Sequence, residues 1–366
     1  MKAVAVVPTQ KSVALIDHEP PRLTRPDHVK VRILEVGVCG TDREICAFDY
    51  GTPPAGSPHL VIGHEALGQV EEVGAAVTRV KPGDLVVPMV RRQCQHDTCT
   101  PCRSERQDFC TTGAFQERGI KEMHGFMTEH IVDEERWLNP LPVHLRQSGV
   151  LVEPLTIAEK ALIQVRGLQQ RLPWTCGHDH ACHRALVLGA GPVGLLGAMA
   201  LAAEGFKVYV YSRSAGNGER QRLVESLGAR FLAAEQVAPE ELPRILGNID
   251  LIYEAMGASQ TSFEVMQHLG TNGVFVFTGV PGRKAPATID TDLLMRNLVL
   301  KNQVVLGTVN AGRDAFANAV RDLGVFQQRW PAALAALITG RFPVENYREL
   351  LLGRPGGIKN VIQFAR

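Results

Sequence analysis

The 366-residue sequence has almost no excess of charge of either sign and few aromatic side chains. Lysine plus arginine total 39 against 38 for aspartate plus glutamate, a net charge of +1, and aromatic residues make up 6%. Nucleic-acid-binding domains usually carry a basic patch, and proteins drawn to anionic membranes usually carry a basic face. The composition therefore argues against both kinds of partner.

Long hydrophobic runs are also scarce. The one uncharged stretch of 19 residues, 185–203, is long enough to be compared with a membrane span, but glycines and a proline interrupt it. A strand, a tight turn and a buried helix explain it better. The apolar run within residues 1–8 is too short for a signal peptide, so we expect a cytoplasmic protein.

Length and residue pattern predict two domains. A chain of 366 residues with 45% apolar and 21% charged residues is typical of a globular protein but too long for one ordinary core. Residues 1–130 read as short β-runs separated by turns, and helical periodicity begins near Gly149, over 150–169. Residues 184–309 then alternate strand and helix patterns, which predicts a parallel sheet with crossover helices. Internal repeats and low-complexity segments are absent from the sequence.

The element boundaries expected in the alternating region follow from its apolar runs. Strands are expected at 185–188, 208–212, 251–253, 274–278 and 304–309, and helices at 192–204, 219–227, 259–269 and 293–298. Two further helices are expected in the tail, near 316–326 and 331–339.

Eight cysteines in a chain taken to be intracellular favour metal binding over disulfides. Four of them have the spacing C-x4-C-x2-C-x7-C, namely Cys94, Cys99, Cys102 and Cys110. Four thiolates so close in sequence suit a closed tetrahedral zinc site that stabilises structure. The run 176–183 also offers cysteine and histidine, but it lies in a connection where histidines are usually solvated, so a third metal site is not expected there.

A second set of metal-ligand residue types lies at the ends of short apolar runs. Cys39, followed by Thr41, and His64 with Glu65 supply a thiol, an imidazole and a carboxylate. A catalytic zinc site uses three protein ligands of these kinds and leaves one position open. A buried cysteine with a satisfied core histidine is the structural alternative. Thr41 with Glu44 also predicts a capping box for the helix that follows.

A glycine-rich turn predicts a dinucleotide site. The motif G-x-G-x-x-G follows an apolar strand and opens a helix, which is the context that gives it meaning; its residues are Gly189, Gly191, Pro192, Val193 and Gly194. The glycines permit the turn, the approach of a pyrophosphate and close packing of helix on strand.

The end of the next strand indicates which dinucleotide binds. An NAD site would carry an acidic residue there, but the chain has Ser212 and Arg213, and no carboxylate until Glu219. A guanidinium can bind a 2′-phosphate. NADP is therefore favoured over NAD, with use of both left open.

Together these motifs resemble the zinc-dependent medium-chain dehydrogenase/reductase superfamily and, within it, the glucose 1-dehydrogenases. The resemblance covers nearly the whole chain and rests on these further segments: 91–92 (RR), 107–110 (QDFC), 117–120 (ERGI), 123–127 (MHGFM), 153–155 (EPL), 159–161 (EKA), 174–176 (WTC) and 307–310 (GTVN). It implies a GroES-like catalytic domain over 1–165 and 311–366 and a doubly wound Rossmann domain over 166–310. It also implies a homo-oligomer, dimer or tetramer.

The resemblance implies roles for single residues. Cys39, His64 and Glu65 would bind the catalytic zinc, with Glu153 as a further ligand or holding its water. Thr41 would relay the substrate proton. Glu117 and Asn310 would bind the sugar, and Asn310 would also lie near the cofactor.

The implied reaction is NAD(P)-linked oxidation of an aldose, glucose or a close relative, at its anomeric hydroxyl to the lactone. Three positions depart from the family pattern, namely Val90, Ile157 and Leu300, and they remove polar partners for the sugar. The cysteine loop also departs, with two extra residues between Cys94 and Cys99. A polyol or amino-alcohol dehydrogenase resembling sorbitol or threonine dehydrogenase is the alternative enzyme. A zinc-ribbon protein that binds nucleic acid and a non-catalytic zinc- and dinucleotide-binding protein are the alternatives of another class.

Overall fold

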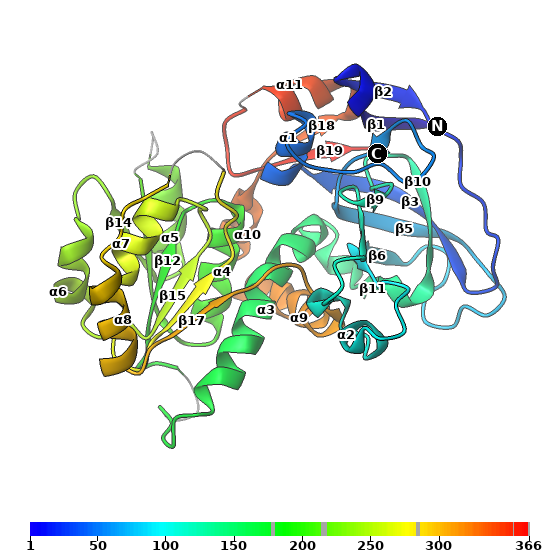
Figure 1. Ribbon diagram of the computed structural model, residues 1–366. Helices are drawn as coiled ribbons and strands as arrows, with labels where there is room; N and C mark the ends of the chain where they lie inside the picture. The colour runs from blue at the N-terminus through cyan, green and yellow to red at the C-terminus, as the bar shows by residue number, and fades with distance from the viewer. Residues whose placement is uncertain (177–179, 214–217, 283–285, 354, 365–366) are drawn as a thin grey trace. The chain divides into compact units, whose positions relative to one another are not determined.

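The computed structural model describes residues 1–176, 180–213, 218–282, 286–353 and 355–364 (Figure 1). Contacts divide the chain into two compact units, which are described separately below. The first unit is Met1–Thr156 with Asn310–Gly324 and Leu334–Arg366, and the second is Ile157–Val309 with Val325–Ala333. No helix within the described residues is both long enough and apolar enough to cross a membrane.

The first unit is rich in β-structure. Its largest sheet has the strand order β11-β6-β5-β3-β19-β18, with β10 also paired to β3. Two three-stranded sheets, β2-β1-β4 and β7-β8-β9, accompany it. The strands are β1 (Lys2–Val7), β2 (Ser12–Asp17), β3 (His28–Gly37), β4 (Leu60–Val61), β5 (Glu65–Val73), β6 (Leu85–Pro88), β7 (Arg91–Arg92), β8 (Gln116–Arg118), β9 (Glu122–Met123), β10 (His130–Glu134), β11 (Leu138–Leu141), β18 (Ile338–Pro343) and β19 (Lys359–Gln363).

The helices of the first unit are short, and three further helices contain most of the boundaries between the units. The short ones are α1 (Gly40–Cys46), α2 (Thr100–Arg103) and α11 (Tyr347–Leu352). Three boundaries fall inside α3 (Val152–Gln169), α9 (Arg313–Arg329) and α10 (Pro331–Leu337), and the fourth, between Val309 and Asn310, precedes α9. Single 3-10 turns complete the unit at 8–10, 107–109, 135–137, 143–145, 149–151 and 344–346.

Strand register brings distant parts of the first unit to one place. Gly37 at the end of β3 is paired with Glu65 at the start of β5 and, on its other side, with Val361 of β19. A side chain at position 37 would overlap the Glu65 carboxylate, so glycine is required there. The chain then turns directly into α1, and the ends of three strands therefore surround the start of this helix.

Helix α1 begins with a capping box, but the predicted residues, Thr41 and Glu44, are wrong. The helix begins two residues earlier than a Thr41 cap requires, with Cys39 as the N-cap and Asp42 at the third helical position. The Asp42 carboxylate accepts a hydrogen bond of 2.9 Å from the Cys39 backbone N–H, and Asp42 is fully buried. A capping box satisfies an end donor wherever a carboxylate sits at this position, so Asp42 takes the place predicted for Glu44.

The second unit is an α/β layer structure around one parallel six-stranded sheet, with order β14-β13-β12-β15-β16-β17. Its strands are β12 (Arg184–Leu188), β13 (Lys207–Ser212), β14 (Arg230–Ala233), β15 (Leu251–Glu254), β16 (Val274–Phe277) and β17 (Val304–Gly307). Its helices are α4 (Pro192–Ala203), α5 (Glu219–Ser226), α6 (Leu242–Leu246), α7 (Ser259–Met266) and α8 (Thr291–Leu300), with a 3-10 turn at 239–241.

The predicted fold class, a β-rich domain combined with a doubly wound parallel sheet, is confirmed. Every strand predicted in 184–309 is present, and two elements of the same region were not predicted, β14 and α6. Strand β14 has four residues and only Leu232 of them is buried, and α6 has five residues and contains Pro243. Elements this short carry too little periodicity to be recognised from sequence.

Three histidines of the first unit lie together. The ring of His124 is stacked on that of His59 at 5.0 Å and lies edge-on to His18 at 4.9 Å. Nδ1 of His124 accepts a hydrogen bond from the Val61 backbone N–H, which holds the imidazole neutral. Burial first, and then the neighbouring charges of His18, His59 and Arg118, lower the pKa of His124 to about 4.

We expect this histidine cluster to weaken the fold at acid pH. An unfolded histidine has a pKa of about 6.5, so between pH 6.5 and 4 the unfolded chain binds more protons at His124 than the folded chain does. The free energy of unfolding therefore falls as pH falls through this window. His124→Asn keeps an acceptor for Val61 and removes the titration, so its melting temperature should decline less between pH 7 and 4.5. His144→Gln, an exposed change, is the control; equal acid sensitivity of the parent and His124→Asn would contradict the prediction.

Candidate functional site

Three side chains predicted as metal ligands meet at the start of α1. One ligand atom each from Cys39, His64 and Glu65 lies within 4.8 Å of the other two. His64 and Glu65 are buried and Cys39 is partly exposed, so the group opens toward solvent on the thiol side. Thr41, the second residue of α1, is also partly exposed. Sulfur, nitrogen and carboxylate donors in this arrangement suit Zn²⁺.

Asp42 orients the His64 ring, a role that the sequence analysis missed. Its Oδ1 lies 3.3 Å from Nδ1 of His64, while its other oxygen caps α1. A carboxylate on one ring nitrogen fixes the tautomer and leaves the other nitrogen for a metal. Burial lowers the pKa of His64, but the Asp42 carboxylate and Cys39 raise it by more, to well above its ordinary value. The signal available in sequence was the acid three residues after Cys39.

Lys359 holds Glu65, which was not foreseen either. Its Nζ donates to Oε1 of Glu65 at 2.8 Å and to the Val38 carbonyl at 3.3 Å, and both charged side chains are buried. Burial lowers the pKa of Lys359, and the Glu65 carboxylate raises it by more, so the net shift is upward. A buried ion pair of this kind keeps the carboxylate ionised and fixed in place.

Glu153 lies in the first turn of α3 and is buried. It is not one of the three mutually close ligand residues, but the charges of His64 and Glu65 shift its pKa. Burial, followed by the neighbouring carboxylates of Glu65 and Asp42, raises the pKa of Glu153 to about 7, against the opposing effect of His64 and Lys359. A carboxyl with a raised pKa beside a cluster of ligand residues is typical of functional sites.

The two predicted sugar-binding residues are in contact. Nδ2 of Asn310 donates to Oε1 of Glu117 at 2.8 Å, and Nε of Arg91 donates to the same oxygen at 3.0 Å. Glu117 is 4% exposed and Arg91 stacks over Phe115 at 3.7 Å. Asn310 has a left-handed backbone, φ +61°, which asparagine tolerates. The polar trio is thus preorganised within the first unit.

The departures from the family pattern lie in different surroundings. Val90 is buried in the core of the first unit, Ile157 is partly buried, and Leu300 is 64% exposed at the end of α8. The Val90 carbonyl accepts the Arg118 backbone N–H at 3.0 Å, so Val90 lies beside the strand that carries Glu117.

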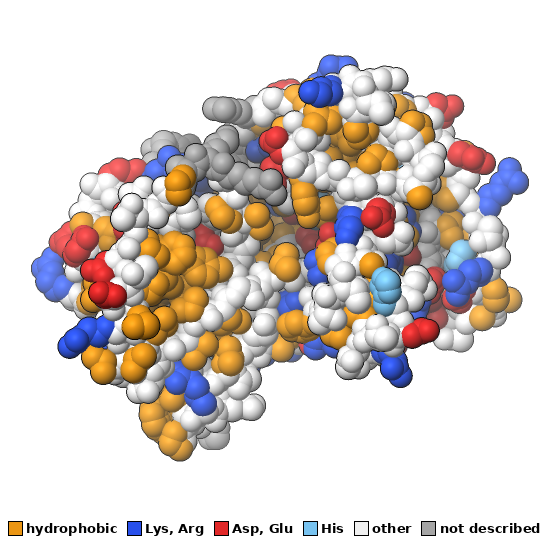
Figure 2. Space-filling view, in the orientation of Figure 1, with side chains coloured by type: hydrophobic (Ala, Val, Ile, Leu, Met, Phe, Trp, Pro, Cys, Tyr) orange, Lys and Arg blue, Asp and Glu red, His pale blue; other side chains and the backbone are white. Residues whose placement is uncertain are grey.

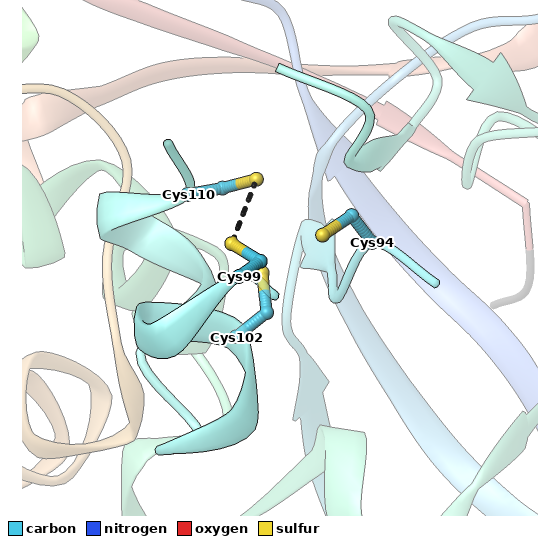
Figure 3. A group of neighbouring side chains, drawn as sticks. All are labelled: Cys94, Cys99, Cys102 and Cys110. Carbon is cyan, nitrogen blue, oxygen red and sulfur yellow. Dashed lines mark hydrogen bonds between the residues drawn. The ribbon is translucent and has the colours of Figure 1, made fainter. Parts of the chain in front are cut away.

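The four clustered cysteines converge as their spacing predicted. The Sγ atoms of Cys94, Cys99, Cys102 and Cys110 all lie within 4.8 Å of one another, as Figure 3 shows. The Sγ atoms of Cys99 and Cys110 are 3.8 Å apart. Hydrogen bonds from the backbone at Cys102 and Thr111 lower the pKa of Cys99 to about 5. Four mutually close sulfurs form a donor set of the kind that suits a structural zinc site.

The glycine-rich turn has the shape that a dinucleotide needs. Gly189 has φ +102°, a left-handed conformation, and Gly191 is the N-cap of α4 with Pro192 as its first residue. A Cβ on Gly194 would overlap the Gly189 carbonyl, whereas a Cβ on Gly191 would meet no atom within 4 Å. Close packing therefore requires the third glycine, and the second leaves the helix N-terminus open to a phosphate. Val193 is partly exposed in the first turn of α4.

Ser212 and Arg213 lie at the carboxyl end of β13, the strand adjacent to β12. Ser212 is the last residue of the strand and is partly exposed, and the Arg213 side chain is exposed. In a parallel sheet of this order, ligands bind outside the carboxyl ends of the strands. Both residues are therefore on the same edge as the glycine-rich turn.

The expectation of metal rather than disulfides fails at one pair of cysteines. Cys176 and Cys182, six positions apart in the connection that leads into β12, form a disulfide. Their Cα atoms are 5.9 Å apart, within the distance that a disulfide can span. Of the nearby run, 177–179 lies outside the described residues.

Comparison with known proteins gives the chain its family. Residues 25–143 match the model of the alcohol dehydrogenase GroES-like domain, and residues 146–364 match that of the glucose dehydrogenase C-terminus. A glucose 1-dehydrogenase of Methanocella arvoryzae is 37% identical over 364 residues, with 99% of each chain covered. A glucose 1-dehydrogenase of Metallosphaera sedula is 35% identical, covering 100% of this chain and 99% of its own.

A solved structure agrees over the full length. Glucose dehydrogenase of Haloferax mediterranei in complex with NADP, Zn and gluconolactone superposes with a TM-score of 0.89, at 31% identity and with 100% of both chains covered. The predicted resemblance is thereby confirmed. This chain belongs to the zinc-containing medium-chain dehydrogenase/reductases, in the glucose dehydrogenase family.

Proposed function

We propose that this protein is a zinc-dependent, NAD(P)-linked dehydrogenase that oxidises an aldose, glucose or a close relative, at the anomeric hydroxyl to the lactone. The observation that carries the proposal is the meeting of Cys39, His64 and Glu65 in a chain of the glucose dehydrogenase family. The first unit would be the catalytic domain and the second the dinucleotide-binding domain.

The residues of the first unit fit a catalytic zinc ion. Cys39, His64 and Glu65 would hold it, with Glu153 as a further ligand or holding a water molecule. Bound zinc would supply Lewis-acid chemistry for the anomeric hydroxyl, and bound NAD(P) would supply the hydride acceptor. Asp42 and Lys359 fix the His64 ring and the Glu65 carboxylate. The Thr41 hydroxyl takes the hydroxyl proton and passes it toward solvent.

The residues of the second unit fit NADP, with NAD as the less favoured alternative. The open N-terminus of α4 at Gly191 would receive the pyrophosphate, and Ser212 and Arg213 would receive the 2′-phosphate. The site carries no acid at the end of β13 to bind the ribose hydroxyls of NAD. The Haloferax relative is known with NADP, which supports the same preference here.

Arg213→Ala should weaken NADP far more than NAD. Only NADP has a 2′-phosphate, and a hydrogen bond to a charged group contributes roughly 1.5–3 kcal/mol, or about tenfold to a hundredfold in affinity. Dissociation constants for both nucleotides, measured by fluorescence titration, check this. Arg230→Ala is a matched control, because Arg230 is also exposed but lies at the amino end of β14, the neighbouring strand, and not at the carboxyl ends of the strands. An equal loss for both nucleotides would make Arg213 structural.

The sugar would bind at Glu117, Asn310 and Arg91. A charged carboxylate held by two donors accepts hydrogen bonds from hydroxyl groups, and polyhydroxy substrates supply them. A polar site of this kind rejects molecules that leave its buried groups unpaired.

A substrate panel tests the proposed reaction. We expect glucose or a close epimer to give the highest kcat/KM among glucose, galactose, xylose, sorbitol, threonine and simple alcohols. Glu117→Gln should raise KM for aldoses by roughly tenfold or more while KM for NADP stays within about twofold. Glu122→Gln, an exposed change on the neighbouring strand β9, should alter neither constant. Sorbitol or threonine outperforming every aldose would replace the sugar assignment with the polyol or amino-alcohol alternative.

We also propose that the protein is a homo-oligomer, a dimer or tetramer. Figure 2 shows hydrophobic side chains gathered over α8 and β17, and β17 is an edge strand of the parallel sheet. Their exposed members include Met295, Val299, Leu300 and Val305. An apolar edge of this kind is usually covered by a partner, and here a second copy would cover it. Light scattering that gave the mass of one chain would contradict this.

A further inference from the structure

The connection that enters β12 gathers four side chains of the types that bind zinc, and it belongs to the second unit, whereas both candidate metal sites described above belong to the first. Sγ of Cys176, Sγ of Cys182 and one ring nitrogen of His183 all lie within 4.8 Å of one another. Nδ1 of His180 lies 3.1 Å from Nδ1 of His183. Two sulfurs and two imidazoles are thus drawn together within one eight-residue run of the second unit.

We propose that, once the Cys176–Cys182 disulfide is reduced, Cys176, His180, Cys182 and His183 bind a zinc ion as a Cys2His2 site. Structural zinc prefers four such ligands in a tetrahedron. Two nitrogens bound to one tetrahedral zinc at about 2.0–2.1 Å each lie roughly 3.3 Å apart. The two Nδ1 atoms already stand close to that separation.

Neighbouring groups hold these ligands in place. The His180 ring stacks on Phe206 with centroids 4.5 Å apart, and its backbone N–H donates to the Glu204 carbonyl at 3.4 Å. The His183 carbonyl accepts the Lys207 N–H at 3.0 Å, which fixes it to the start of β13. The Cys182 backbone N–H donates to Sγ of Cys176 at 3.0 Å. A backbone donor at sulfur stabilises the thiolate that a metal requires, and outer contacts of this kind orient metal ligands.

The disulfide and the zinc site exclude each other, because both use the same two sulfur atoms. A phosphine reductant with water splits the S–S bond, taking up the oxygen to become the phosphine oxide, while two protons and two electrons give two thiols. Zinc binding then displaces the two thiol protons. The oxidised chain is therefore closed by a covalent bond and the reduced chain by a metal.

The number of zinc ions in reduced protein tests the proposal. Full-length wild type and Cys176→Ser/Cys182→Ser are reduced with a phosphine, incubated with zinc, freed of excess metal and analysed by mass spectrometry of the metal. We expect the wild type to hold one zinc ion per chain more than the double variant. The test compares the zinc content of the wild type with that of the double variant. Its result therefore does not depend on whether the proposed catalytic zinc or the proposed activity is correct. Cys46→Ala, which removes a buried cysteine elsewhere, should keep the wild-type count.

A second variant protects the test against a folding defect. His183→Gln keeps both thiols and should weaken binding of the extra zinc by at least about tenfold in a competition with a chromophoric chelator. Dehydrogenase activity should stay unchanged in both variants, since neither touches the proposed catalytic or sugar-binding residues. Equal zinc counts in reduced wild type and double variant, or unchanged affinity in His183→Gln, would overturn the proposal.

Discussion

His64→Ala is expected to lower kcat by at least about 10³-fold while the protein still binds NADP. Loss of the imidazole removes one of three ligands, and the charge stabilisation that the metal gives the reaction is worth several kcal/mol, where roughly 4 kcal/mol is 10³-fold in rate. The glycine-rich turn belongs to the second unit, so its nucleotide site is left intact. Steady-state kinetics, zinc content and NADP titration on one preparation measure the three effects together.

Two further variants make this result specific. Asp42→Asn keeps every proposed ligand but weakens the carboxylate that orients His64, so we expect an intermediate loss of about tenfold to a hundredfold in activity or zinc affinity. His130→Gln, at a histidine that pairs with Glu71 outside the cluster, should leave kcat unchanged. Substantial turnover by His64→Ala after all zinc has been stripped would exclude this site as the catalytic centre.

Cys102→Ser is expected to remove one zinc ion per chain and to expose the cysteine loop to proteases. The four sulfurs form a small cluster of their own, separate from the main core of the first unit, and the polar contacts of the loop, such as Gln93 to the Cys102 carbonyl and Arg106 to Asp108, lie around this cluster. A structural zinc contributes folding free energy directly, and its loss opens the segment that it closes. Cleavage within 93–113 should therefore accelerate on the order of a hundredfold or more, while the catalytic zinc is retained.

Cys46→Ala serves as the matched control for this variant. Cys46 is buried in α1, and burial raises the pKa of its thiol to about 12, so it stays a neutral thiol. Its replacement should cost some stability through a small cavity but should leave the zinc content unchanged. If Cys102→Ser and Cys46→Ala retained the same zinc content, the cysteine loop would not be a metal site.

Local patterns in the sequence predicted much of this protein. Apolar strands alternating with helices gave the parallel sheet, and four cysteines within 17 residues gave the sulfur cluster. The glycine-rich turn was recognised because it depends only on residues close together in sequence. Gly189 adopts a left-handed backbone, and Gly194 packs against the Gly189 carbonyl. Each of these features lies within one or two adjacent elements.

The remaining features depend on contacts that local pattern does not encode. Lys359 is 294 residues from Glu65, and Asn310 is 193 residues from Glu117. The first pair forms because β3 is hydrogen-bonded to β5 on one side and to β19 on the other. This pairing brings the starts of β5 and β19 to the end of β3. Strand register is fixed by burial over whole sheets, and a lysine at the start of a late strand looks like any surface cation in sequence.

The sequence by itself determined the fold class, the family resemblance and the types of residue that could bind metal and nucleotide, because spacing within one element sets which side chains share a turn. Only the tertiary structure decided which charged groups hold those residues: Asp42 for His64, Lys359 for Glu65, and Arg91 for Glu117. It also joined Cys176 to Cys182 beside His183. The physical reason is that buried charges must be paired, and the partner that pairs them is chosen by packing across the whole domain rather than by position in the chain.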